Sequence, residues 1–383
     1  MINDYKISSL SFTLMFICII NALLPGTLFP YMIYEAKTSV FISILINYFI
    51  GLVMILLFIK LFNYLPSESI FGKIKKIFPN IIAKIIGTFI LFLIFIFAIC
   101  VFWRYSTFIS LEFLTETPNI FVTLIIILPI IYIMFYDIDT IARVSVFCTF
   151  IGFILFLNNF ISLFGLVDLS NFKPLLNNDL SHIVKSSLVF VTLNVVPILS
   201  LLIIPKNSVL DNEKLPKNLI IGYTMNTICI CGIFFAIIGV MGIELSSLFT
   251  FPSYEVLKTI NMFSFLDNIE NLNISIWILF MTFSVSYNML ILKYGIKEIF
   301  NIKNKRVIFI LCALIIVLLA SVVIFMIPYE NYINKYKRLY TYVPFTLLLT
   351  SIVSIIFIYV SGKIKFRKQE KKLKTLNIEK PAN

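Results

Sequence analysis

The amino-acid sequence predicts an all-α polytopic membrane protein with about ten transmembrane helices. Three observations lead to this fold class. Of the 383 residues, 60% are hydrophobic and 13% are charged, and the mean hydropathy is +1.02. Ten apolar runs are long enough to cross a bilayer, which takes about 20 residues of helix. The charged residues gather between these runs, so no part of the chain has the composition of a soluble domain.

The predicted spans follow one another at short intervals, and the fourth is the shortest. They occupy residues 10–33, 40–62, 81–107, 120–135, 144–165, 186–204, 219–242, 274–292, 308–326 and 343–360. We expect four parts of the chain: a cytoplasmic N-terminus (1–9), a first five-helix repeat (10–165), a second five-helix repeat (186–360) and a basic cytoplasmic tail (361–383).

The distribution of basic residues predicts the orientation. About three quarters of the 31 Lys and Arg residues fall on the side of the N-terminus when the spans are threaded in order, so both termini are expected to be cytoplasmic. The net charge of +12 therefore gives no ground for a nucleic-acid partner. The basic run 363–374 is of the kind attracted to anionic membrane lipid, although a topogenic role alone explains it equally well. Residues 70–78 predict a basic amphipathic helix on the cytoplasmic interface.

The first span contains a helix-breaking sequence. Pro25 cannot donate a backbone hydrogen bond, and Gly26 directly after it adopts angles that other residues avoid. Within hydrocarbon a broken helix survives where it lines a cavity or packs on protein, and secondary transporters place such breaks at their binding sites. We expect Gly26 and Thr27 to contact a ligand, with the amides of the second half-helix facing an anionic group. A plain proline kink is the alternative.

The sixth span mirrors the first. If the ten spans form two inverted repeats of five, span six corresponds to span one. It carries Thr192 and Asn194 just before Pro197, so we expect a second break at Pro197 and ligand contacts from the two polar side chains. Proline is frequent in membrane helices, so this correspondence rests on two features.

Other polar residues within or near the spans can be interpreted either as functional or as structural. Ser284 and Tyr287 of span eight are candidate ligand contacts, although Ser and Thr also join helices to one another. Arg104 near the outer end of span three is expected to snorkel to the head groups, because it stands beside Trp103. His182, the one histidine, is expected to be solvated in an outer loop.

The sequence gives no support for an enzyme. It contains no Gly-rich phosphate loop, no H-E-x-x-H motif and no nucleophile elbow, and no group of His, Cys, Asp and Glu has metal-ligand spacing. We therefore predict no catalytic residue, no metal and no cofactor. A nucleotide-driven transporter is also excluded, because such a protein needs a nucleotide-binding domain.

Several stretches in order resemble the B subunits of GerA-type spore germinant receptors. They are Leu-Pro-Gly-Thr-Leu-Phe-Pro at 24–30, Leu-Thr-Glu-Thr-Pro at 114–118, Asp-Ile-Asp-Thr-Ile-Ala-Arg at 137–143, and the loop 251–270 with Trp277. The resemblance covers most of the chain. It departs from the family pattern at Thr115, where proline is usual, at Asp137, where glycine is usual, and in span six, which lacks the usual acidic residue.

The resemblance implies a fold, a function and partners. The fold is that of the amino acid–polyamine–organocation superfamily (LeuT-like), with two inverted five-helix repeats and broken helices one and six. The function is an integral subunit of a nutrient receptor in the spore inner membrane, acting with an A subunit and a lipoprotein C subunit. It would bind a small nutrient and trigger germination. The alternatives are a secondary amino-acid or solute permease on the same scaffold, and a structural subunit that binds no ligand.

Overall fold

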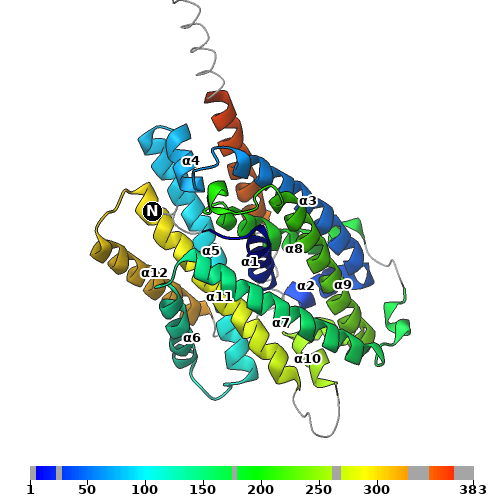
Figure 1. The fold of residues 1–383 in the computed structure, drawn as a ribbon. Coiled ribbons are helices and arrows are strands. Elements are labelled where there is room, and N and C mark those ends of the chain that lie inside the picture. The colour runs from blue at the N-terminus through cyan, green and yellow to red at the C-terminus, as the bar shows by residue number, and fades with distance from the viewer. Residues whose placement is uncertain (1–5, 23–27, 175–178, 261–268, 327–344, 366–383) are drawn as a thin grey trace, which may run out of the picture.

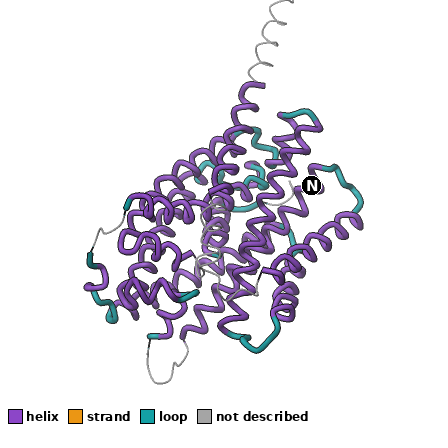
Figure 2. Tube along the Cα trace, turned by 180° about the vertical axis from the view of Figure 1, so that it is seen from behind, coloured by secondary structure: helices purple, strands orange, loops and turns teal. Residues whose placement is uncertain are grey.

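The computed structural model describes residues 6–22, 28–174, 179–260, 269–326 and 345–365, and within these ranges the regular elements are helices joined by short turns (Figures 1 and 2). The helices are α1 (Ser9–Asn21), α2 (Leu28–Ala36), α3 (Val40–Asn63), α4 (Ile70–Ile77), α5 (Asn80–Glu112), α6 (Asn119–Ile133), α7 (Ile138–Phe164), α8 (Leu180–Leu201), α9 (Leu215–Leu248), α10 (Pro252–Lys258), α11 (Ile269–Ile299) and α12 (Lys305–Met326). A last helix covers Phe345–Lys365. Single 3₁₀ turns lie at Lys37–Ser39, Leu169–Phe172 and Lys206–Ser208.

The helices match the apolar runs of the sequence. Within the described ranges, eight helices are long and apolar enough to cross a membrane, and α1 and α6 are shorter apolar helices. The ten predicted spans correspond to α1 with α2, then α3, α5, α6, α7, α8, α9, α11, α12 and the last helix. The prediction of an all-helical membrane protein is therefore confirmed.

The first span is divided into two helices. Helix α1 ends at Asn21 and α2 begins at Leu28, while Pro25, Gly26 and Thr27 lie outside the described residues. The sixth span differs from the expectation of a break, because α8 is one helix that continues through Pro197. The hydroxyl of Ser200 donates to the carbonyl of Pro197 at 2.6 Å, so a side chain supplements the backbone hydrogen bonds there. The structure thus places Pro197 inside a helix, where sequence reasoning placed a second chain break.

The packing follows the two-fold relation between the repeats. Helix α3 of the first repeat packs on α8, and α9 of the second packs on α1 and α2 in the equivalent way. Likewise α5 packs on α6 and α12, while its counterpart α11 packs on α12 and α6. The most extensive contact joins α5 to α11, which are each other's counterparts. A pattern that repeats under a shift of five spans is what inverted repeats produce.

Helix α4 lies between the ends of the long helices. It packs on α5 and α11 through Ile70, Phe71 and Ile74, all buried. The predicted amphipathic helix is therefore present, but Lys73 on it is buried with 1% of its surface exposed. Its Nζ donates to the carbonyl of Leu61 at 2.8 Å, near the end of α3, where a helix carries unpaired carbonyls and partial negative charge.

The loop between α9 and α11 contains a short helix. The sequence predicts a helix over 253–265, and α10 (Pro252–Lys258) occupies the first part of it, while residues 261–268 lie outside the described ranges. Helix α10 packs on α9, α11 and α2. Shortly before it, α9 kinks at Gly242, whose φ of 72° and ψ of 174° are open to glycine and strained for other residues. This kink turns the end of α9 toward the loop.

Candidate ligand-binding region

The sequence-predicted contacts fall in two helices and one segment. Gly26 and Thr27 belong to residues 23–27, outside the described ranges, and the side chain of Asn194 is likewise outside the description. Thr192 is 7% exposed, and its hydroxyl donates to the carbonyl of Leu188 at 3.0 Å within α8. Ser284 and Tyr287 are fully buried in α11.

Helix α11 holds two buried polar groups with unused hydrogen-bonding capacity. The hydroxyl of Ser284 is buried and has no hydrogen-bond partner. Asn288, one turn further on, is also fully buried. Its Nδ2 donates to the carbonyl of Ser284 at 2.6 Å, while its Oδ1 accepts no hydrogen bond. Burying such a group unpaired costs about 1–3 kcal/mol. Sequence reasoning missed Asn288, and its four-residue spacing from Ser284 was the available signal.

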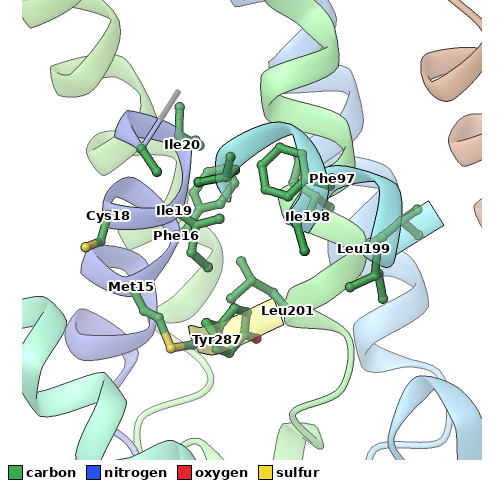
Figure 3. Packing of buried hydrophobic residues seen from close by; sticks show 14 of the residues in the cluster. Met15, Phe16, Cys18, Ile19, Ile20, Phe97, Ile198, Leu199, Leu201 and Tyr287 are labelled. Carbon is green, nitrogen blue, oxygen red and sulfur yellow. The ribbon is translucent and has the colours of Figure 1, made fainter. Parts of the chain in front are cut away.

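Tyr287 belongs to an apolar plug in the middle of the bundle. In Figure 3 its neighbours include Met15 and Phe16 from α1, Phe97 from α5 and Leu201 from α8, and all belong to one buried cluster. All are buried. The hydroxyl of Tyr287 donates to the carbonyl of Ser200 at 3.1 Å, which joins α11 to the last turn of α8. The side chains of this plug fill the space between the helices of the first repeat and those of the second repeat.

A cavity of about 530 Å³ lies beside the divided first span. Asn21 at the end of α1 and Phe29 at the start of α2 both line it, so it adjoins the segment that joins these helices. Helices α7, α9, α10 and α11 supply the other walls. The described residues that line it include no Asp, Glu, Lys, Arg or His, and aromatic side chains such as Phe156 and Trp277 predominate over polar ones.

An amide pair is one of the polar groups that line this cavity. The Nδ2 of Asn21 donates to the Oδ1 of Asn226 on α9 at 3.0 Å. Asn226 is 6% exposed, and its own Nδ2 has no hydrogen-bond partner. Nearby, Thr149 of α7 donates to the carbonyl of Leu14 at 3.2 Å. Asn226 was not predicted as a site residue, although an asparagine within an apolar run could have been singled out.

Arg104 is buried inside the bundle. It is 4% exposed, and its guanidinium carbon lies 4.7 Å from the ring centroid of Phe251 and 5.8 Å from that of Trp103. The prediction of snorkelling is therefore wrong. The reason is tertiary: the segment that begins α10 folds over the end of α5 and places an aromatic ring on the arginine.

His182 pairs with an acidic residue of another helix. Its Nδ1 lies 2.7 Å from Oε2 of Glu35, so the start of α8 is joined to α2. The histidine side chain is 43% exposed and the glutamate 11%. The expectation of a solvated histidine in a loop holds only for its partial exposure: His182 lies in the first turn of α8, and the chain brings the last turn of α2 beside it.

Comparisons with known proteins identify the fold. The structure is similar to that of Mhp1, a nucleobase-cation-symport-1 family transporter in a closed conformation with bromovinylhydantoin bound, at 14% identity over 94% of this chain and 93% of that one, with a TM-score of 0.60. It is also similar to the manganese transporter of Eremococcus coleocola in complex with an aromatic bis-isothiourea substituted compound, at 11% identity over 92% and 79%, with a TM-score of 0.54. At such identities the likeness shows the fold alone.

The sequence comparisons identify the family. No curated protein matches the sequence significantly. A family model described as spore germination protein (spore permease) matches residues 9–330, which is most of the chain. The divided first span and the transporter-type helix packing agree with this match. The chain is an integral membrane protein that belongs to the spore germination protein family.

Proposed function

We propose that this protein is the integral membrane subunit of a nutrient germinant receptor, which binds a small nutrient and triggers spore germination. The observation that carries the proposal is the presence of two fully buried acceptors, Ser284 Oγ and Asn288 Oδ1, that have no partner inside a tightly packed bundle. A protein keeps such costly groups where a ligand completes their hydrogen bonds.

The ligand we propose is an amino acid or a similarly small polar nutrient. Its polar groups would meet Ser284 and Asn288 of α11, Thr192 and Asn194 of α8, and Gly26 and Thr27 of the first span. A carboxylate on the ligand would accept hydrogen bonds from the backbone amides at the N-terminus of α2, because helix N-termini favour anions. Neutral side chains from α8 and α11 would select by hydrogen bonding, since none of those named carries a charge.

Binding would be converted into a signal through the plug. Ser284 lies one turn from Tyr287, whose hydroxyl holds α11 to α8. A ligand that prefers one arrangement of these helices shifts the population of the whole subunit toward it. The partners we propose to read this shift are an A subunit and a lipoprotein C subunit in the spore inner membrane, with both termini of this chain cytoplasmic.

Substitutions on one helix test the proposal. In spores carrying Ser284→Ala or Asn288→Ala, we expect the nutrient concentration for half-maximal dipicolinate release to rise by a factor of about ten, the scale of one or two hydrogen bonds. Ser286→Ala is the matched control. Its hydroxyl is also buried without a partner, but it points about 200° away around the helix. Equal responses in all three strains would count against this site.

The second candidate is a secondary permease for amino acids or related solutes, and the transporters among the similar structures favour it. Fold cannot separate the two, because one scaffold hosts both activities. Uptake of a radiolabelled amino acid into proteoliposomes with the purified chain would support the permease. If the protein were a structural subunit without a ligand, the Ser284 and Asn288 variants would still assemble with their partners and the spores would still respond to the nutrient. Variants that assemble an intact complex but no longer respond would argue against this third role.

A further inference from the structure

The cavity beside the first span has the shape of a long groove. Its lining residues on α7 run from 146 to 163, and those on α9 from 222 to 236. At 1.5 Å per helical residue these stretches measure about 26 and 21 Å. Helix α1 packs on both α7 and α9 and contributes Leu14 and Ile17 as the floor. The groove therefore runs along the helices for much of the thickness of a bilayer.

The groove opens sideways between α7 and α9. Phe150 and Met225 line it and are 65% and 57% exposed, so they form its rim. Both lie within helices long and apolar enough to span a membrane. Exposed aromatic and aliphatic side chains at this position face hydrocarbon and not water. A molecule dissolved in the bilayer can thus reach the groove without crossing either head-group layer.

Among the described residues that line the groove there is a buried, unpaired hydrogen-bond donor and no Asp, Glu, Lys, Arg or His. The Nδ2 of Asn226 is buried and unpaired, while its Oδ1 is already engaged by Asn21. An unpaired amide costs free energy wherever water is excluded. Trp277 and Phe280 of α11 add flat apolar surface on the opposite wall.

We propose that this groove binds an uncharged, mostly apolar small molecule that enters from the bilayer and accepts a hydrogen bond from Asn226 through a carbonyl, ester or hydroxyl oxygen. A volume of about 530 Å³ is that of a drug-sized ligand site, and mostly apolar walls with a few placed polar groups are typical of such sites. A charged molecule is excluded, because a buried ion needs a partner.

The occupant would touch both halves of the divided first span. Asn21 ends α1 and Phe29 lies at the start of α2, and both line the groove. A bound molecule therefore biases the arrangement of these two half-helices and acts as a modulator from the membrane. This site is separate from the polar groups of α8 and α11 proposed for the nutrient, and it stands whether or not that proposal holds.

Tryptophan fluorescence tests the site in the full-length protein reconstituted into vesicles. The chain has two tryptophans, so Trp103→Phe leaves Trp277 of the groove as the only one. The probe is a long-chain bromoalkanol, whose bromine quenches tryptophan on contact. We expect saturable quenching that the unbrominated alkanol reverses. In Asn226→Leu the dissociation constant should rise by a factor of about two to ten, the contribution of one hydrogen bond.

A filling variant and its control complete the experiment. Cys229→Phe places a ring in the groove and should abolish saturable quenching. Ile228→Phe, next to it but 60% exposed and outside the groove, should leave the quenching intact. Quenching that rises linearly with membrane concentration in every variant would overturn the proposal, since the probe would then be dissolved in bulk lipid. Quenching by brominated phospholipid that no alkanol displaces would also overturn it, because the occupant would then be bilayer lipid.

Discussion

Nδ1 of His182 lies 2.7 Å from Oε2 of Glu35, and this contact links the first turn of α8 to the last turn of α2. The two helices also meet through the hydroxyl of Ser186, which donates to the carbonyl of Met32 at 3.4 Å. The second half of the first span is thus held to the sixth span near one end of the bundle.

The first prediction concerns this pair. In a double-mutant cycle of His182→Leu and Glu35→Leu, the coupling free energy should be small, at most ~1 kcal/mol, because the histidine is partly exposed to solvent. Thermal unfolding of the purified protein in detergent would measure it. Lys185→Leu, one turn further along α8, supplies a control that should show no coupling to Glu35. Strictly additive effects of the two leucines would show that the contact does not contribute to stability.

The second prediction concerns the kink in α9. Gly242 has a φ of 72° and a ψ of 174°, a region that is nearly closed to residues with a Cβ atom. Gly242→Ala should lower the free energy of unfolding by ~1–3 kcal/mol. Gly165 is the matched control, since its φ of −71° is ordinary and no atom would lie within 4 Å of an added Cβ. Equal stabilities of the two alanine variants would refute the argument from backbone strain.

The third prediction concerns pH. Burial lowers the pKa of Lys73 from its ordinary 10.5 to about 7, and the negative charge of Glu68 opposes this shift only in part. The unfolded chain keeps the proton up to about pH 10.5, whereas the folded protein loses it above about pH 7. Unfolding therefore takes up a proton between these values, so the Lys73 contribution to stability rises with pH in this window.

Melting temperatures at pH 7 to 10 would check this dependence. The rise with pH should be smaller in Lys73→Met, which keeps the aliphatic part of the side chain but cannot be protonated. Lys84→Met on α5 serves as the control, because Lys84 is partly exposed and not buried like Lys73. If the wild type and Lys73→Met had parallel profiles, the buried amine would not be the titrating group.

The fourth prediction concerns the packing of α10. The guanidinium of Arg104 lies 4.7 Å from the ring centroid of Phe251, the residue before α10, and such a contact contributes ~1–2 kcal/mol when it is desolvated. Arg104→Leu should loosen α10. In a background without the native cysteines, Ser253→Cys, which replaces a buried serine, should then react several-fold faster with a water-soluble thiol reagent.

A surface arginine provides the comparison for this experiment. Arg143→Leu removes an arginine whose side chain is 81% exposed and whose partner, Asp139, lies on the same helix. It should leave the labelling rate at position 253 unchanged. An equal rate in the Arg104 and Arg143 variants would mean that the cation over the ring does not hold α10 in place.

Several features of the fold could be predicted because they depend on local sequence alone. A continuous apolar run of sufficient length becomes a helix in a bilayer, since every backbone group must find its partner within the segment. The sequence also predicts a break at Pro25 and Gly26, which lie outside the described residues, between the end of α1 and the start of α2. Pro197 shows the limit of this reasoning: a proline removes one donor, but the neighbouring structure decides whether the helix breaks or continues, and here α8 continues.

The sequence by itself determined the spans and the family resemblance, and it predicted a break in the first span. Only the tertiary structure decided which side chains of the apolar spans meet one another. Phe16 is fully buried while Phe150 is 65% exposed, and hydropathy cannot separate them because lipid is as apolar as a protein core. For the same reason only the tertiary structure shows that the side chains of Asn226, Asn288 and Arg104 are buried, although the sequence places all three within apolar runs. Helical periodicity says which residues share a face, but the neighbouring helix that covers this face is chosen by packing over the whole chain.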